Sequence, residues 1–196
     1  LKYFTEFWCS DDTDPYERIY IQWSLSKFFP AKTMGSHVTN WNRRASVKFR
    51  TDVCSSCKLG FDIDLKSLSQ DEYKFVQSAV KNYNDMKPVI LEGDQYRLIS
   101  PYESDHCALN YVSKDRQCAV LFVYDLHPRY KEPLRNVKLQ GLDARKVYTV
   151  RETNLMPGAK SWLECDGKQY SGDYLMKVGL NVLTANEGSS RVLVLE

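Results

Sequence analysis

Carboxylates cluster near the start of this chain, directly after an apolar run. Asp11, Asp12 and Asp14 follow the aromatic segment 7–8 and precede Pro15. Asp14 before a proline is typical of a helix start, with the aspartate as N-cap and the proline in the first turn. A strand that ends in carboxylates just before a helix is also how parallel α/β barrels present an acid or a base. The alternative is that the carboxylates only cap the helix and solvate the loop.

The elements expected around this loop alternate between strand and helix. Apolar residues recur at helical spacing after Asp14, and Ser69 with Glu72 forms a capping box. The expected elements are an apolar strand up to residue 8, a helix over 14–29, a strand over 31–38, a helix over 47–57, a strand over 59–63 and a helix from Ser69 that Pro88 ends. Successive strand–helix units of this kind predict a parallel sheet with helical crossovers.

The pattern changes near Gly93. Short apolar or alternating runs, separated by turn residues, follow at regular intervals and predict an antiparallel β-sandwich. The sequence therefore divides into an α/β part over 1–93 and an all-β part over 94–196. Trp162 is expected in the sandwich core. The expected strands lie at 96–99, 107–112, 119–124, 137–139, 147–150, 162–165 and 191–195.

Charge and hydropathy exclude two classes of partner. The formal net charge is +2, and the basic residues are scattered, so we expect no nucleic-acid partner. No apolar run approaches the roughly 20 residues of a membrane span, so no membrane is expected either. No signal peptide is visible. The chain starts without Met, inside an expected strand, as a piece of a longer polypeptide would, and its location, cytoplasmic or periplasmic, stays undetermined.

The cysteines give a weak signal for metal or redox chemistry. Cys54 and Cys57 form one C-x-x-C pair without a second pair, and His106 with Cys107 is distant in sequence. We interpret the cysteines as small buried side chains. The expectation is that the protein uses no metal and no cofactor.

Taken together, the motifs resemble the C-terminal portion of the glycoside hydrolase family 36 α-galactosidases, the melibiases. The matches occur in the family's order and cover almost the whole chain. The matching segments are FWCSDDTDP with ER at 7–18, FPAKTMGSHV at 29–38, LGFDIDL at 59–65, YRLISPYE at 96–103 and LMKVGL at 175–180.

The resemblance implies the last three units of a (β/α)₈ barrel, followed by the antiparallel β-sandwich. It also implies hydrolysis of terminal α-D-galactosyl residues, as in melibiose and raffinose, with retention at the anomeric carbon. Asp11 matches the family's general acid/base, and Asp12 stands where the family accepts Asp or Asn. The nucleophile lies in a Lys-Trp-Asp strand end that this sequence lacks. We therefore expect the chain alone to be inactive and to form part of a homo-oligomeric enzyme.

The remaining site residues are expected to contact the sugar. Trp8 and Cys9 could form a wall of low polarity beside the acid. His37 follows Gly35 at another strand end, where it contacts either a hydroxyl or only its own protein surroundings. Trp41 could stack on a sugar ring or pack against the next helix. Asp12 completes the expected substrate-binding set with Trp8, Cys9, His37 and Trp41.

Two other functions remain open at this point. The all-β part could be a non-catalytic carbohydrate-binding or assembly module that binds through exposed tyrosines. The enzyme could also transfer galactose between oligosaccharides, as a raffinose-synthase-like relative would. The tyrosines considered for the module are Tyr124, Tyr130, Tyr170 and Tyr174.

Overall fold

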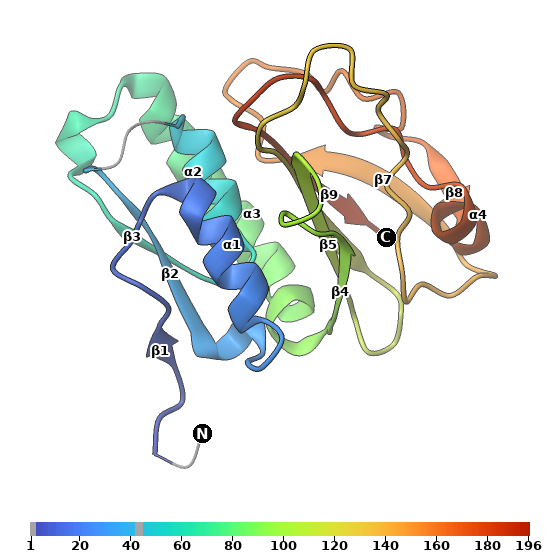
Figure 1. Cartoon of the computed structure of the whole chain (residues 1–196), viewed down its shortest axis with the longest axis horizontal. Helices are drawn as coiled ribbons and strands as arrows, with labels where there is room; N and C mark the ends of the chain where they lie inside the picture. The colour runs from blue at the N-terminus through green and yellow to red at the C-terminus, as the bar shows by residue number, and fades with distance from the viewer. Residues whose placement is uncertain (1–2, 42–44) are drawn as a thin grey trace.

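The computed structural model describes residues 3–41 and 45–196. A three-stranded parallel sheet, three helices and a six-stranded antiparallel sheet follow one another as layers (Figure 1). The parallel sheet has the order β1 (Phe7–Trp8), β2 (Met34–Thr39) and β3 (Lys58–Asp62). The helices between the two sheets are α1 (Pro15–Leu25), α2 (Val47–Ser55) and α3 (Gln70–Glu92). Two 3₁₀ turns, η1 (Ala31–Thr33) and η2 (Leu65–Ser67), complete this half.

Each helix begins at a residue whose side chain accepts the first free backbone N–H groups. Asp14 accepts from the N–H groups of Tyr16 and Glu17 at the start of α1. Ser46 caps α2, and Ser69 opens α3 with the expected capping box. The starts of α1, α2 and α3 are therefore encoded locally, and the starts expected for these three helices are confirmed.

The expectation that Pro88 ends the third helix is wrong. α3 continues through Pro88 to Glu92, and Gly93 is its C-cap. An internal proline removes one helical hydrogen bond and costs about 3 kcal/mol. The last turn nevertheless buries Ile90 to 1% exposure, in the apolar cluster between the helices and the antiparallel sheet. Burial of this turn outweighs the local signal.

The antiparallel sheet has the order β4-β5-β6-β9-β7-β8. One face of this sheet packs against the helices. The opposite face is covered mostly by irregular chain and by α4 (Gly172–Lys177), with one isolated bridge between Val137 and Leu180. The sequence predicts two packed β-layers in this half. The structure has one sheet, and the second layer is mainly irregular chain. The strands are β4 (Asp94–Ile99), β5 (His106–Val112), β6 (Ala119–Asp125), β7 (Val147–Thr153), β8 (Gln169–Ser171) and β9 (Ser189–Leu195).

Trp162 does not lie in the core. Its side chain is 61% exposed, whereas Leu163 and Cys165 of the same segment are buried. Residues 162–165 form no strand, so the alternation that would place Trp162 inside does not apply.

Among the described residues, no helix is long and apolar enough to cross a membrane.

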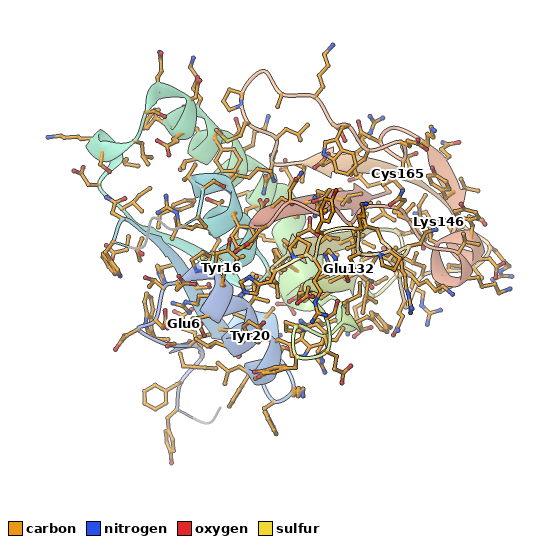
Figure 2. All side chains as sticks on the ribbon, turned by 45° about the horizontal axis from the view of Figure 1, so that its top comes forward. Glu6, Tyr16, Tyr20, Glu132, Lys146 and Cys165 are labelled. Atoms are coloured by element: carbon orange, nitrogen blue, oxygen red, sulfur yellow. The ribbon has the colours of Figure 1, made fainter. Side chains whose placement is uncertain are left out.

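The first turn of α1 joins the two halves of the chain. The ring of Tyr16 lies 5.1 Å from the Phe49 ring on α2 and stacks 5.7 Å from the ring of His127, which follows β6. Figure 2 labels Tyr16 at this junction of helices and sheet. Offset aromatic pairs of this kind contribute about 0.5–1.5 kcal/mol beyond their buried area. The helix that follows the acidic loop is therefore fixed against the antiparallel sheet.

A buried charged network ties β5, β6 and β9 together. His106 Nδ1 lies 2.7 Å from Asp125 Oδ1, and its Nε2 lies 3.6 Å from Glu132 Oε2. Arg191 also donates to Asp125, as do Thr184 and Ser189. The hydrogen bond to Asp125 raises the pKa of His106 despite its burial. Burial by itself would raise the pKa of Asp125. The hydrogen bond from His106 and the charge of Arg191 outweigh burial and hold this pKa below its usual value.

This network predicts a pH dependence of stability. Because folding raises the pKa of His106 above the value near 6.5 of the unfolded chain, its contribution is complete below that pH. The contribution is lost as the pH rises through the folded-state pKa. The free energy of unfolding should therefore fall as the pH rises above about 6.5. Urea denaturation at a series of pH values on both sides of this point measures the fall.

Replacement His106→Gln should remove this alkaline decline, because Gln does not titrate. His127→Gln is the matched control and should leave the decline in place, because His106 is still present. An alkaline decline of the same size in His106→Gln would contradict the assignment.

Candidate functional site

The three parallel strands end at one edge, and the candidate residues gather there. Trp8 of β1 pairs in register with Gly35 of β2, and His37 of β2 pairs with Gly60 of β3. Because the strands run parallel, the loops that follow them leave from the same edge. Asp11 lies in the loop after β1, which leads into α1 (Figure 1).

The carboxylates of this loop have different surroundings. Asp12 Oδ1 accepts from the backbone N–H of Asp14 at 2.9 Å, and Asp14 in turn caps α1. Ser10 Oγ accepts from the N–H of Asp12 at 3.0 Å. Asp11 is exposed, and its carboxylate takes part in no hydrogen bond with any other described residue. Local turns thus use the side chains of Asp12 and Asp14, and Asp11 is available to a ligand.

Trp8 and His37 form an aromatic pair beside this loop. Their ring centroids lie 4.2 Å apart, with planes inclined by 31°. Trp8 is 44% exposed. Burial, and then the charge of Arg18, lower the pKa of His37, so the neutral ring is favoured at neutral pH. Its Nδ1 is buried and has no hydrogen-bond partner among the described residues.

Glycine in β3 provides the space for this histidine. A Cβ at Gly60 would overlap the His37 ring, so a larger residue there displaces the ring or the strand. The sequence analysis missed this role. A glycine inside an expected strand is the signal that could have indicated it, because such glycines often mark a close approach by a neighbour.

Cys9 follows β1, and Trp41 follows the neighbouring strand β2. Cys9 is half-buried, and burial raises the pKa of its thiol against the opposing charge of Arg18. Trp41 follows β2 and is 67% exposed. The structure therefore pairs Trp8 with His37 at this edge, places Cys9 and Asp11 in the chain that follows β1, and places Trp41 after the neighbouring strand.

A buried polar layer under the edge fixes the strands to the helices. Ser36 Oγ donates to Gln22 Oε1 at 2.6 Å, and Gln22 Nε2 donates to Ser56 Oγ and to the carbonyl of Val53 at 3.0 Å. These bonds link α1, β2 and the end of α2. Buried amides that are satisfied in this way hold their neighbours in one arrangement. These hydrogen bonds thus hold β2, which carries His37, against α1 and the end of α2.

The thiols of the C-x-x-C pair are buried. Burial raises the pKa of Cys54 to about 11 and raises the pKa of Cys57 further, so both thiols stay protonated. Over residues 3–41 and 45–196, no group of three or more His, Cys, Asp or Glu side chains could hold a metal ion. The side chains of Cys54 and Cys57 fill the interior, as expected.

The tyrosines considered for a binding module do not form one surface. Tyr124 is buried at 1% exposure, Tyr130 is 89% exposed on a loop, and Tyr170 stacks on Tyr174 with ring centroids 5.2 Å apart. These tyrosines therefore do not form a common stacking platform for a sugar.

Comparison with protein families matches nearly the whole chain in two parts. Residues 1–93 match the family described as Melibiase, and residues 106–195 match the glycosyl hydrolase family 36 C-terminal domain.

Several curated relatives carry the name alpha-galactosidase. Probable alpha-galactosidase G of Aspergillus terreus is 32% identical over 100% of this chain and 26% of its own length. Alpha-galactosidase AgaA of Geobacillus stearothermophilus is 30% identical over 92% of this chain and 24% of its own length. The chain thus spans about a quarter of the length of these relatives.

Solved structures give the same result. The crystal structure of the GH36 alpha-galactosidase AgaB from Geobacillus stearothermophilus has a TM-score of 0.86 and 29% identity, and covers 100% of this chain and 26% of its own. Crystal structures of AgaA variants from the same organism, in complex with raffinose and with stachyose, have a TM-score of 0.83 each, at 28% and 29% identity. Each covers 95% of this chain and 25% of its own.

Proposed function

This chain belongs to glycosyl hydrolase family 36, and we propose that it is the part of a retaining α-galactosidase that carries the general acid/base, Asp11. The proposed reaction is hydrolysis of terminal α-D-galactosyl residues of oligosaccharides such as melibiose and raffinose. Structures of related alpha-galactosidases with raffinose and stachyose support this substrate class. The nucleophile belongs to the barrel strands that this chain does not include.

The position of Asp11 carries this proposal. Its carboxylate is exposed in the loop at the carboxyl end of β1, and it lies between Ser10 and Asp12, whose side chains accept backbone hydrogen bonds. Catalytic groups of parallel barrels lie in such loops. A retaining glycosidase needs a second carboxylate about 5 Å away, on the other side of the sugar. A neighbouring strand of the closed barrel could supply it.

The proton would move twice in this mechanism. Asp11 gives its proton to the leaving oxygen while the nucleophilic carboxylate forms the bond to the anomeric carbon. The Asp11 carboxylate then takes a proton from water, whose oxygen attacks the same carbon, and both carboxylates return to their starting states. Two displacements on opposite faces give net retention.

The residues around Asp11 would contact the sugar and its leaving group. The exposed faces of Trp8 and Trp41 offer apolar surface for a pyranose ring. His37, neutral at pH 7, can exchange a hydrogen bond with a hydroxyl group. Cys9 and Asp12 flank the acid as the remaining members of the proposed substrate-binding set.

The proposal also assigns a separate role to each half of the chain. Residues 1–93 would close the catalytic barrel, and residues 94–196 would form a separate β domain that supports it through the helices. The complete enzyme would be homo-oligomeric. The chain alone should not turn over substrate, because it contains neither the nucleophile nor the other barrel strands.

Hydrolysis by the full-length protein tests the function. Proton NMR of melibiose hydrolysis should show the α-anomer of galactose forming first, with the β-anomer appearing by mutarotation. Initial release of the β-anomer, or no release of galactose from melibiose and raffinose, would contradict the proposal. A product in which galactose is joined to a second sugar would favour transfer over hydrolysis.

The space at Gly60 gives a second test of the site. Replacement Gly60→Ala should displace His37 and lower kcat/KM for melibiose by about tenfold to a hundredfold, since misplacement by about 1 Å has such effects. Gly35→Ala is the matched control, because the nearest atom to its Cβ would be 3.4 Å away. Equal kcat/KM in both variants would show that the position of His37 does not matter for the reaction.

A further inference from the structure

Arg18 is a charged side chain that lies completely inside the protein. It stands one turn into α1 and is 0% exposed. Its Nη2 donates to the carbonyl oxygen of Ser10 at 2.9 Å, and its guanidinium lies 5.6 Å from the centre of the Trp8 ring. The side chain therefore connects the helix with the residue directly before Asp11.

The hydrogen-bonding capacity of this guanidinium is mostly unused. Nε and Nη1 are buried and donate to no acceptor in the described part of the chain. A guanidinium carries five N–H donors and stays charged in proteins. A buried charge without a partner is costly. This one is bonded to the Ser10 carbonyl, one residue before the proposed acid/base.

The groups around Arg18 do not neutralise it through their own charge. Burial raises the pKa of Cys9, Cys54 and Cys57, so these thiols are uncharged. Burial and Arg18 itself lower the pKa of His37, on which Asp62 and Glu6 act in the opposite direction. The carboxylates of Asp12 and Asp14 accept backbone hydrogen bonds at the start of α1. The hydrogen bond to the Ser10 carbonyl therefore ties Arg18 to the loop of Asp11.

We propose that Arg18 is a positioning residue for Asp11: it fixes the loop of the acid/base through the Ser10 carbonyl. This inference rests on the proposed function. Asp11 must give its proton to the leaving oxygen in the first step, so the loop must hold its carboxyl group within reach of that oxygen. Arg18 keeps its own protons throughout, so it exchanges nothing with the substrate.

Two substitutions in the full-length protein test the hydrogen bond to Ser10. Arg18→Met removes the donor, and it should lower kcat for melibiose by about tenfold or more with little change in KM. The loss should be much smaller for an aryl α-galactoside with an acidic phenol, whose leaving oxygen needs no proton. Arg18→Lys keeps a donor but loses the planar fork, so its kcat for melibiose should fall less than that of Arg18→Met. Arg145→Met, at a side chain that is 93% exposed, is the control and should leave the rates on both substrates unchanged.

Thermal unfolding and circular dichroism show whether each variant folds. A folded Arg18→Met variant with unchanged kcat for melibiose, or with an equal loss on both substrates, would overturn the proposal. Should Arg18→Met fail to fold, Arg18→Lys decides. An unchanged kcat for melibiose would overturn the positioning role, and a kcat that falls more for melibiose than for the aryl substrate would support it. Asp11→Asn, assayed beside these variants, tests the proposed function itself, so a loss of that function is distinguishable from a failure of this inference.

Discussion

Replacement of Asp11 by Asn in the full-length protein should lower kcat for melibiose and raffinose by about a hundredfold to ten-thousandfold, the usual contribution of a general acid. The amide cannot donate the proton that a poor leaving group needs. Aryl α-galactosides with acidic phenols leave without that proton, so their first step should slow much less. The measurement is a plot of rate against leaving-group pKa, which should become steeper in Asp11→Asn.

Asp12→Asn is the matched control for this experiment. The side chain at position 12 accepts a backbone hydrogen bond, which the Asn carbonyl can also accept. Its kcat should therefore remain within about tenfold of the unsubstituted protein, below the usual range for a lost general acid. A large loss in Asp12→Asn together with a small loss in Asp11→Asn would assign the acid to position 12.

The second large effect concerns stability at Asp52. This carboxylate is 0% exposed on α2 and accepts from Lys48 at 2.5 Å, from Asn154 at 2.8 Å and from Ser190 at 2.7 Å. Its partners come from the helix, from the residue after β7 and from β9. Asp52→Ala leaves a partly buried ammonium and two polar groups without their acceptor. Loss of one partner from a buried ion pair costs about 3–5 kcal/mol.

Urea denaturation of the full-length protein measures this loss as a lower midpoint. Asp173→Ala is the matched control, because Asp173 also pairs with a lysine four residues later but with a side chain that is 49% exposed. Exposed pairs of this spacing contribute about 0.3–0.5 kcal/mol, so the midpoint should hardly move. Equal midpoints for both variants would mean that Asp52 does not join the helices to the sheet.

Much of the α/β half could be predicted because its signals are local. Asp14 and Ser69 cap their helices through bonds to residues two or three positions away, and these bonds do not depend on the rest of the fold. The end of α3 could not be predicted, because burial of Ile90 against the antiparallel sheet overrides the signal of Pro88. Trp162 was misplaced for a related reason, since its segment is a loop and not a strand.

The candidate site could be predicted only in part. The motif indicated Asp11 and its neighbours, because they lie next to each other in the sequence. The His37 ring lies where a Cβ at Gly60 would stand, and Arg18 is completely buried. Both features depend on the packing of segments that are far apart in the chain. No periodicity or spacing contains that information. Both features were found only in the folded chain.

The most direct test of the account is rescue of Asp11→Asn by azide. With an activated aryl α-galactoside, the variant should accumulate the galactosyl–enzyme, because no base remains to activate water. Azide needs no base, so it should restore turnover and give α-galactosyl azide, the product of two inversions. Absence of both rescue and the azide product, while the variant is folded and binds galactose, would contradict the assignment of Asp11 as the acid/base.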